Sequence, residues 1–103
     1  MVYYRRLSKS GQISIPKTVE QQLNLKEGHY LYVYQYKESI IIVNHHSNKT
    51  LNQCIYRNGK VSIPAELRRL LGISFETPLE MTLADDQNKI IIKAEKQILL
   101  KDA

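Results

Sequence analysis

Residues 59–64 have the sequence Gly-Lys-Val-Ser-Ile-Pro, and residues 11–16 have the sequence Gly-Gln-Ile-Ser-Ile-Pro. The two stretches are offset by 48 positions, and the same offset carries Leu31 onto Leu79. The similarity therefore extends well beyond the six-residue motif. An internal repeat of this length indicates two equivalent supersecondary units in one chain.

Further along the chain the offset changes, because the isoleucines at 40–42 correspond to those at 90–92. The stretch 84–89 is longer than its counterpart 36–39, and such an insertion is typical of a hairpin loop. Each unit has fewer than about 50 residues, a size at which a separate hydrophobic core is usually insufficient. We therefore predict one core, shared by a first repeat at 1–47 and a second repeat at 48–103.

Composition bounds the class of protein. The aliphatic runs, such as residues 40–43, are far shorter than the ~18 apolar residues that a membrane span requires, and no signal peptide is visible. We expect a cytoplasmic protein. Cys54 is the single cysteine, so neither an internal disulfide nor a multi-cysteine metal site is expected.

Charge is unevenly distributed along the chain. The net charge is +5 and the pI is about 9.4. Segments 1–26 and 49–69 each contain five basic residues and one acidic residue, whereas the rest of the chain is net acidic. Positive charge thus collects in the opening part of each repeat, which is typical of a protein with an anionic partner.

Each repeat is predicted to contain a strand, a turn, a second strand, a short helix and two further strands joined by a hairpin. In the first repeat the opening strands are expected at 3–7 and 13–15. In the second repeat Asn58-Gly59 is a strong signal for a tight hairpin turn. The fold class is therefore mostly β with short helices.

The helix boundaries are marked by specific residues. Pro16 and Pro64 suit the first helical position, N1, because proline has a fixed φ and lacks the N–H that would be unpaired there. Asn24 and Gly72 suit the left-handed residue that ends a helix. After the helices an alternating pattern returns, and four side chains are expected to face the core: Leu31, Val33, Leu79 and Met81.

The ordered motif at 59–73, Gly-Lys-Val-Ser-Ile-Pro-Ala-Glu-Leu-Arg-Arg-Leu-Leu-Gly-Ile, resembles the SpoVT/AbrB-like family of bacterial DNA-binding domains, which also occurs in MazE-type antitoxins. The first repeat resembles it less closely. The resemblance implies a swapped-hairpin AbrB-like β-barrel made of two βαββ units, normally from two chains. With both units in one chain, we predict an intramolecular pseudo-dimer connected by residues 44–52, with a chain-swapped dimer as the alternative.

In this family, basic residues before the turn, just after its glycine and along the short helix contact DNA. The resemblance therefore implies a set of DNA-binding residues: Arg5, Arg6, Lys9, Lys17, Arg57, Lys60, Arg68 and Arg69.

These residues are divided between the repeats. Arg5 and Arg6 lie where the second repeat is expected to have Gln53 and Cys54. A second set of differences runs the other way: Lys60, Arg68 and Arg69 lie where the first repeat has Gln12, Glu20 and Gln21. We infer one composite, asymmetric DNA face, unlike that of a true homodimer. Gln12, Gln53 and Asn58 are candidate base readers.

No catalytic, cofactor or metal site is predicted. No nucleophile with a base and no phosphate loop is found, and Asp85-Asp86 is interpreted as a solvated turn. His29, His45 and His46 lack a nearby cysteine or carboxylate cluster, so they are a poor ligand set. Lys26 and Lys49 are interpreted as solvated surface charges. An enzyme is therefore the least favoured class.

The predicted function is double-stranded DNA binding by a nucleoid-associated transcriptional regulator, of repressor or transition-state type, with possible self-association. The first alternative is an antitoxin that binds its operator and a toxin. Antitoxins of this fold usually act through a long C-terminal tail, whereas only residues 94–103 follow the last predicted strand, with 98–100 as a short docking candidate. The second alternative is a protein-interaction scaffold that uses one face of a strand, formed by Tyr30, Tyr32, Tyr34 and Tyr36.

Overall fold

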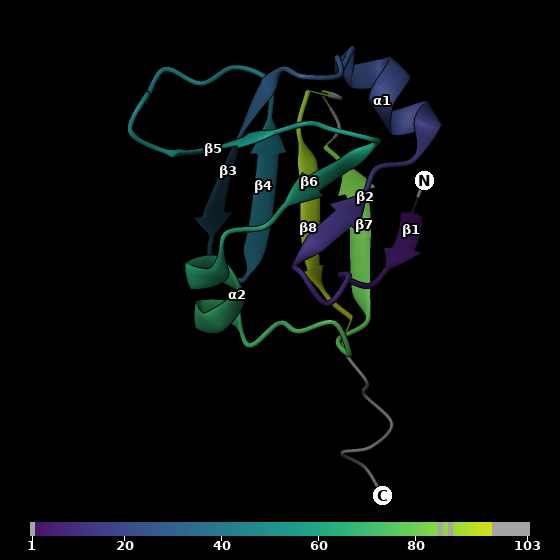
Figure 1. Cartoon of the computed structure of the whole chain (residues 1–103), viewed down its shortest axis with the longest axis vertical. Helices are drawn as coiled ribbons and strands as arrows, with labels where there is room; N and C mark the ends of the chain where they lie inside the picture. The colour runs from purple at the N-terminus through teal and green to yellow at the C-terminus, as the bar shows by residue number, and fades with distance from the viewer. Residues whose placement is uncertain (1, 85, 87, 96–103) are drawn as a thin grey trace, which may run out of the picture.

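The structure is a computed structural model that describes residues 2–84, 86 and 88–95. Its elements follow in chain order (Figure 1): β1 (Val2–Arg5), β2 (Gln12–Ser14), α1 (Lys17–Leu23), β3 (Tyr30–Tyr36), β4 (Ser39–Val43), β5 (Asn52–Ile55), β6 (Lys60–Ser62), α2 (Ala65–Leu71), β7 (Leu79–Leu83) and β8 (Ile90–Ala94). The prediction of a mostly β fold with two short helices is confirmed. No helix in the described part of the chain is long and apolar enough to cross a membrane.

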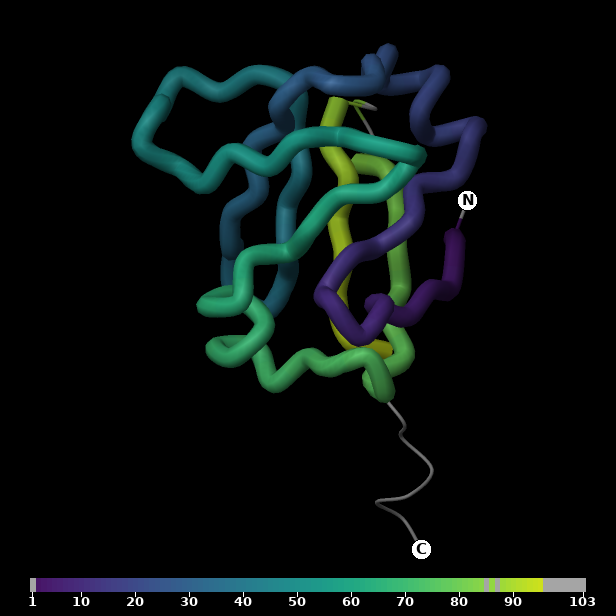
Figure 2. Tube along the Cα trace, viewed as in Figure 1, coloured from purple at the N-terminus to yellow at the C-terminus, as the bar shows by residue number. Residues whose placement is uncertain are grey.

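Strand pairing crosses between the two halves of the chain. A six-stranded antiparallel sheet has the order β1-β7-β8-β4-β3-β5, and β2 pairs with β6 in a separate two-stranded ribbon. The opening strand of each half therefore pairs with a strand of the other half. Figure 2 shows this exchange: the purple N-terminal strand runs beside green β7, and the ribbon of purple-blue β2 and teal-green β6 crosses in front of the sheet.

In two of the cross-half pairs, β2 with β6 and β4 with β8, the register follows the sequence repeat. Ile13 pairs with Val61 in the ribbon, and Ile41 pairs with Ile91 in the sheet. Each of these residues is thus opposite its own counterpart under the offsets of 48 and 50. Two further hydrogen bonds extend the ribbon in the same reciprocal way, from Ile15 N–H to the Gly59 carbonyl and from Ile63 N–H to the Gly11 carbonyl, both 2.9 Å. This reciprocal pairing relates the two halves by an approximate two-fold axis.

Both halves contribute to one hydrophobic core between the sheet, the ribbon and the helices. The four side chains predicted to face inward from β3 and β7 have no exposed surface, which confirms that prediction: Leu31, Val33, Leu79 and Met81. Ile13 and Val61 of the ribbon are equally buried. Residues of both halves are therefore packed in this single cluster.

The turn before the ribbon differs between the halves by one residue. In the first half Ser8 N–H donates to the Gln12 carbonyl, whereas in the second half Arg57 N–H donates to the Lys60 carbonyl. The first turn therefore contains one more residue. As a result Arg5 is paired with Leu79, while Cys54 is paired with Leu31, the counterpart of Leu79.

This difference corrects one sequence-based equivalence. The prediction that Arg5 and Arg6 correspond to Gln53 and Cys54 is wrong by one position, since Arg5 corresponds to Cys54 and Arg6 to Ile55. The opening strand is also shorter than predicted, because β1 ends at Arg5.

The helix ends agree with the sequence except at the N-terminus. Pro16 and Pro64 were predicted to be the first helical residues, N1. In the structure they are the N-cap residues, and each helix begins one position later. Their backbone is extended in ψ (146° and 138°), as at the junction between a strand and a helix. Asn24 and Gly72 end the helices in the left-handed conformation, as predicted. Helices of seven residues depend on packing for their stability.

The connector between the halves covers part of the tyrosine face. Tyr32 is only 7% exposed, and it forms a second apolar cluster with Ile41 and Val43 on the outer face of the sheet. The ring of His46 in the connector lies 5.2 Å from the ring of Tyr34 and 6.2 Å from that of Tyr32. The face predicted for a protein partner is thus partly used within the chain, and the scaffold hypothesis is left with Tyr30 and Tyr36, which are 60% and 59% exposed.

The predicted hairpin loop at 84–89 is present, closed by a hydrogen bond from Ala84 N–H to the Lys89 carbonyl at 3.0 Å. Asp85 and the docking candidate at 98–100 lie outside the described residues.

Candidate nucleic-acid interface

The second turn holds two cations at fixed positions. Arg57 and Lys60 exchange backbone hydrogen bonds of 3.1 and 3.0 Å across the turn, so their side chains flank Asn58-Gly59. The ribbon pairing places Gln12 opposite Ser62 next to them. Together these residues line a surface hollow of about 220 Å³ with Ile55 and Asn58. The hollow therefore combines two positive charges with amide and hydroxyl groups, which are the groups that contact nucleic-acid backbones.

The carboxylate of Glu27 is bound to the same turn. It accepts hydrogen bonds from the backbone N–H groups of Asn58 (2.9 Å, to Oε1) and Gly59 (3.1 Å, to Oε2). These two bonds, followed by the charges of Lys17 and Arg57, hold the pKa of Glu27 below its ordinary value. Lys17 and Arg57, which are far apart in the sequence, are thus brought near the same carboxylate.

Acidification should remove the stabilising effect of this carboxylate. A depressed pKa in the folded state means that the ionised form contributes stability above about pH 4.5, and that this contribution is lost as the pH falls through the folded pKa. We expect Glu27→Gln to lower the melting temperature at about pH 7 and to lower it much less at about pH 3. Thermal unfolding followed by circular dichroism at both pH values checks this. A difference between the two proteins that does not change with pH would contradict it.

The first turn is organised by an arginine of the other half. Arg68 of α2 donates from Nε to the Ile63 carbonyl at 3.0 Å. Its guanidinium lies against Gly11, since a Cβ built on Gly11 would be 2.6 Å from Cζ of Arg68. Lys9 lies on the same turn, with Nζ 5.6 Å from the centre of the Phe75 ring. Arg68 and Lys9 therefore place positive charge at the first turn.

Substitutions at the two turn glycines distinguish the cost of backbone strain from the cost of displacing Arg68. Gly11 and Gly59 both have positive φ (88° and 71°), but a Cβ at Gly59 would meet no atom within 4 Å. We expect Gly59→Ala to cost about 1–2 kcal/mol for the left-handed backbone alone. Gly11→Ala should cost about 3 kcal/mol, because it also displaces Arg68 from its hydrogen bond. Urea unfolding of both variants measures the difference, and equal losses would contradict the packing role of Arg68.

The counterpart of Arg68 has the opposite charge. Under the offset of 48 it is Glu20, which accepts a hydrogen bond from the Tyr56 hydroxyl at 2.8 Å and lies 3.7 Å from Lys17 Nζ. Burial, then the bond to Glu20, raises the pKa of Tyr56 above its ordinary value. The helix of one half thus supplies a cation and the helix of the other half an anion, which makes the two turns electrostatically different.

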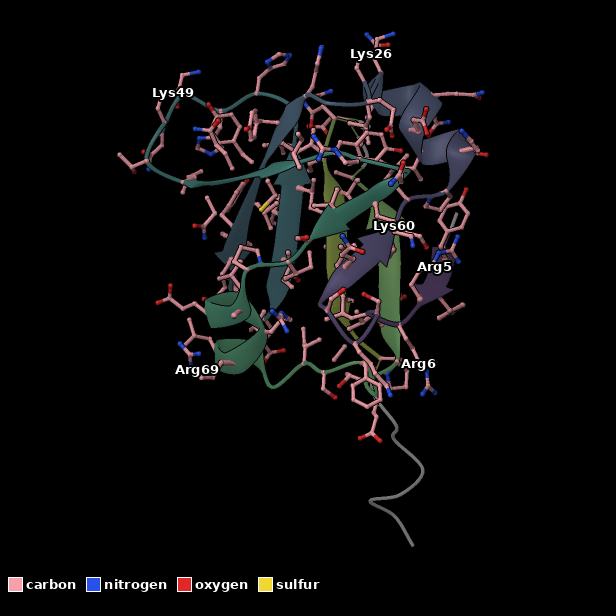
Figure 3. All side chains as sticks on the ribbon, in the orientation of Figure 1. Arg5, Arg6, Lys26, Lys49, Lys60 and Arg69 are labelled. Carbon is pink, nitrogen blue, oxygen red and sulfur yellow. The ribbon has the colours of Figure 1, made fainter. Side chains whose placement is uncertain are left out.

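The remaining predicted cations lie in other places. Arg5 and Arg6 line a second hollow, of about 270 Å³, with Pro78 and Leu79, and Arg6 donates to the Glu76 carbonyl at 3.4 Å. Figure 3 shows Lys60 on the ribbon, Arg5 and Arg6 on the β1 side, and Arg69 on α2 at the opposite side. Lys26 and Lys49 lie at the end of the molecule near α1 and the connector.

The eight predicted residues therefore form separate groups on one molecule. Lys17, Arg57 and Lys60 surround the second turn, and Lys9 and Arg68 surround the first.

Sequence reasoning missed Glu27 as part of this site. The signal was present in the repeat, because the offset of 48 places Glu27 opposite Phe75, a difference in charge and in shape. A comparison of the two repeats confined to basic residues did not include that pair.

An apolar groove with acidic edges lies elsewhere on the surface. It measures about 660 Å³, and two of its apolar side chains, Tyr4 and Leu70, are 60% and 62% exposed. The residues that line it are Tyr4, Glu38, Leu70, Leu71, Glu80, Lys93, Ala94 and Glu95. Exposed apolar surface of this kind is typical of a protein-binding site rather than a DNA-binding site.

Comparisons with known proteins agree with this fold. The solution structure of PHS018 from Pyrococcus horikoshii is similar to this one, with a TM-score of 0.55 over 93% of this chain and 92% of that chain. The sequences are 16% identical, so this likeness shows the fold alone. No curated protein matches the sequence. The predicted second family domain at 48–103 stays a prediction. Residues 4–50 match the model of the family described as "Antidote-toxin recognition MazE, bacterial antitoxin", of the AbrB/MazE-like superfamily.

Proposed function

We propose that this protein binds double-stranded DNA through the basic residues at its two turns and acts as a transcriptional regulator. The observation that carries the proposal is the ribbon, whose cross-half pairing places Arg57 and Lys60 beside Gln12 and Ser62 in one surface hollow. The match of residues 4–50 to a MazE-type antitoxin family supports it, because domains of the AbrB/MazE type are DNA-binding regulators or antitoxins.

The chemistry is attraction between fixed cations and phosphates. A guanidinium donates two parallel hydrogen bonds to a phosphate, and a lysine acts as a point charge. Such contacts fix the position of the protein on the duplex, while sequence is read by contacts to base edges or through DNA shape. Gln12 and Asn58 in the hollow are the proposed base readers. No bond is made or broken, so the proposed role is binding rather than catalysis.

The two turns bind DNA unequally in this proposal. Arg68 adds positive charge at the first turn, while Glu20 and Glu27 oppose the cations at the second. A homodimer of identical units reads the two halves of a palindrome in the same way, because symmetry makes its contacts equivalent. This chain would favour an asymmetric target as a monomer, and a second copy would restore the symmetry. We place this activity in the cytoplasm, at the nucleoid.

Chemical-shift mapping with isotope-labelled protein tests the location of the interface. On addition of a DNA duplex, we expect the largest amide shifts at residues 8–12 and 57–62. Shifts confined to the exposed tyrosines of β3, or to the groove around Leu70, would contradict the proposed face.

An antitoxin is the second candidate. Two observations favour it: the printed description of the matched family and the apolar groove with Glu38, Glu80 and Glu95 at its edges. A partner with apolar and basic side chains fits that groove. In this case DNA and the protein partner would bind to different surfaces, and the same mapping experiment with each ligand separates them.

A further inference from the structure

The turn at Asn58-Gly59 has the geometry of an anion-binding site. Both residues have positive φ (56° and 71°), the backbone pattern of a type I′ turn. Their two consecutive N–H groups converge on the two oxygens of one carboxylate, that of Glu27. Consecutive backbone N–H groups that converge in this way bind anions in many proteins. In this structure the anion comes from the chain itself.

The surroundings of this turn favour a phosphate as much as a carboxylate. Arg57 and Lys60 flank it, and the charges of Lys17 and Arg57 act on the Glu27 carboxylate. Asn58 also lines the hollow of about 220 Å³ that contains Gln12 and Ser62. A phosphate presents the same pair of oxygen acceptors to these donors, with at least as much negative charge.

The Glu27 side chain, which is bound to the turn, lies on the protein surface. Glu27 is exposed, and it follows α1 in the loop closed by a hydrogen bond from His29 N–H to the Lys26 carbonyl. Its carboxylate can therefore rotate into solvent without breaking the core, and an incoming phosphate oxygen can take its place on the two N–H groups.

The first turn provides an internal comparison. The counterpart of Glu27 there is Phe75, whose ring lies next to the ammonium group of Lys9. At the same place in the repeat, one half thus has an aromatic ring and the other a carboxylate bound to the turn. This difference is not needed for the fold, since both halves form the same ribbon.

We propose that the N–H groups of Asn58 and Gly59 form a phosphate-binding site that Glu27 occupies, so that Glu27 acts as an internal competitor of DNA. The inference about DNA rests on the proposed function, whereas the phosphate site itself does not. When Glu27 leaves, the turn gains one phosphate contact between Arg57 and Lys60. Glu27 therefore lowers the affinity for DNA and sets the second turn apart from the first.

Titration with inorganic phosphate tests the site without DNA. In Glu27→Gln the side chain keeps an acceptor oxygen but loses its charge, so the turn is preserved and the competitor is weakened. We expect saturable shifts of the Asn58 and Gly59 amide signals when phosphate is added to the full-length variant, and much weaker shifts in the original protein. Absence of such shifts in the variant overturns the proposal.

Duplex binding tests the competition. Glu27→Gln should bind DNA about fivefold more tightly at ~0.15 M salt, because a duplex phosphate replaces the carboxylate on the two N–H groups. Glu38→Gln is the matched control, because it changes the net charge equally at an exposed residue of the β3–β4 hairpin. Equal effects of the two variants, or weaker binding by Glu27→Gln, reject the competitor role.

Glu27→Asp provides a variant with unchanged net charge. Its side chain is shorter by one methylene, so its carboxylate reaches the turn less well. We therefore expect its affinity for DNA to lie between that of the original protein and that of Glu27→Gln. If no protein in the series binds DNA while phosphate still binds to Glu27→Gln, the proposed function fails and the phosphate site stands.

Discussion

Replacing Arg57 and Lys60 together with alanine should lower the affinity for duplex DNA about 30-fold at ~0.15 M salt, and should flatten the slope of log K against log salt by about 1.8. Each of these side chains is assigned one phosphate, and each phosphate contact releases condensed counterions. The core is untouched by the change, because both residues flank an exposed turn. Fluorescence anisotropy with a labelled duplex at several salt concentrations measures both quantities.

A second double variant controls for net charge. Lys37→Ala with Lys49→Ala removes the same two charges from exposed positions away from the second turn, one in the β3–β4 hairpin and one in the connector, where Figure 3 labels Lys49. We expect a change in affinity of less than about threefold, since distant exposed charges are screened over about 8 Å at this salt concentration. Similar losses in the two double variants would mean that overall charge, and not the hollow at the second turn, attracts DNA.

Separating the halves should abolish the fold. Fragments 1–47 and 48–103 each lose the partner of an opening strand, because β1 pairs with β7 and β5 pairs with β3. Each also loses half of the ribbon and half of the shared core. We expect each fragment alone to be an unfolded monomer by circular dichroism and sedimentation, since fewer than about 60 residues without a complete core are rarely stable.

Coexpression of the two fragments is the control. The connector between β4 and β5 covers the outer face of the sheet and supplies none of the strands. The fragments together should therefore recover the native spectrum and purify as a one-to-one complex. A folded, monomeric fragment 1–47 would contradict the shared core, whereas a folded homodimer of that fragment would be compatible with it.

The repeat explains why so much of the fold was predictable. Under the offset of 48, many buried apolar positions of one half have apolar counterparts, as with Ile13 and Val61, which are both buried at the centre of the ribbon. Helix ends were predictable for a local reason. Asn24 and Gly72 adopt the left-handed conformation that few other residues accept, so their positions mark the C-termini.

The errors came from contacts that a local pattern does not contain. One extra residue in the first turn shifts the pairing of β1, and it was hidden because the alignment was fixed on Gly11 and Gly59. The partial burial of the tyrosine face depends on the path of the connector, which places His46 against Tyr32 and Tyr34. Strand alternation predicts which side chains share a face, but not what covers that face.

The candidate site was predictable in composition and not in arrangement. Charge clustering and the family resemblance identified Arg57, Lys60 and Arg68, whereas the structure shows that Arg68 crosses to the turn of the other half. The bond between Glu27 and the second turn joins residues more than thirty positions apart, so the repeat could single out Glu27 by its difference from Phe75 but could not identify its bonding partner. The electrostatic asymmetry of the two turns follows from these tertiary contacts.

The most direct test of the central claim is a titration of the purified protein into a labelled duplex of its own upstream region, beside a scrambled duplex, at several salt concentrations. If the five cations at the two turns each contact a phosphate, the account predicts tighter binding to the upstream duplex and a slope of log K against log salt of about −4.5. Absence of binding to either duplex at low salt would contradict DNA binding as the function, and would direct attention to a protein partner at the groove around Leu70.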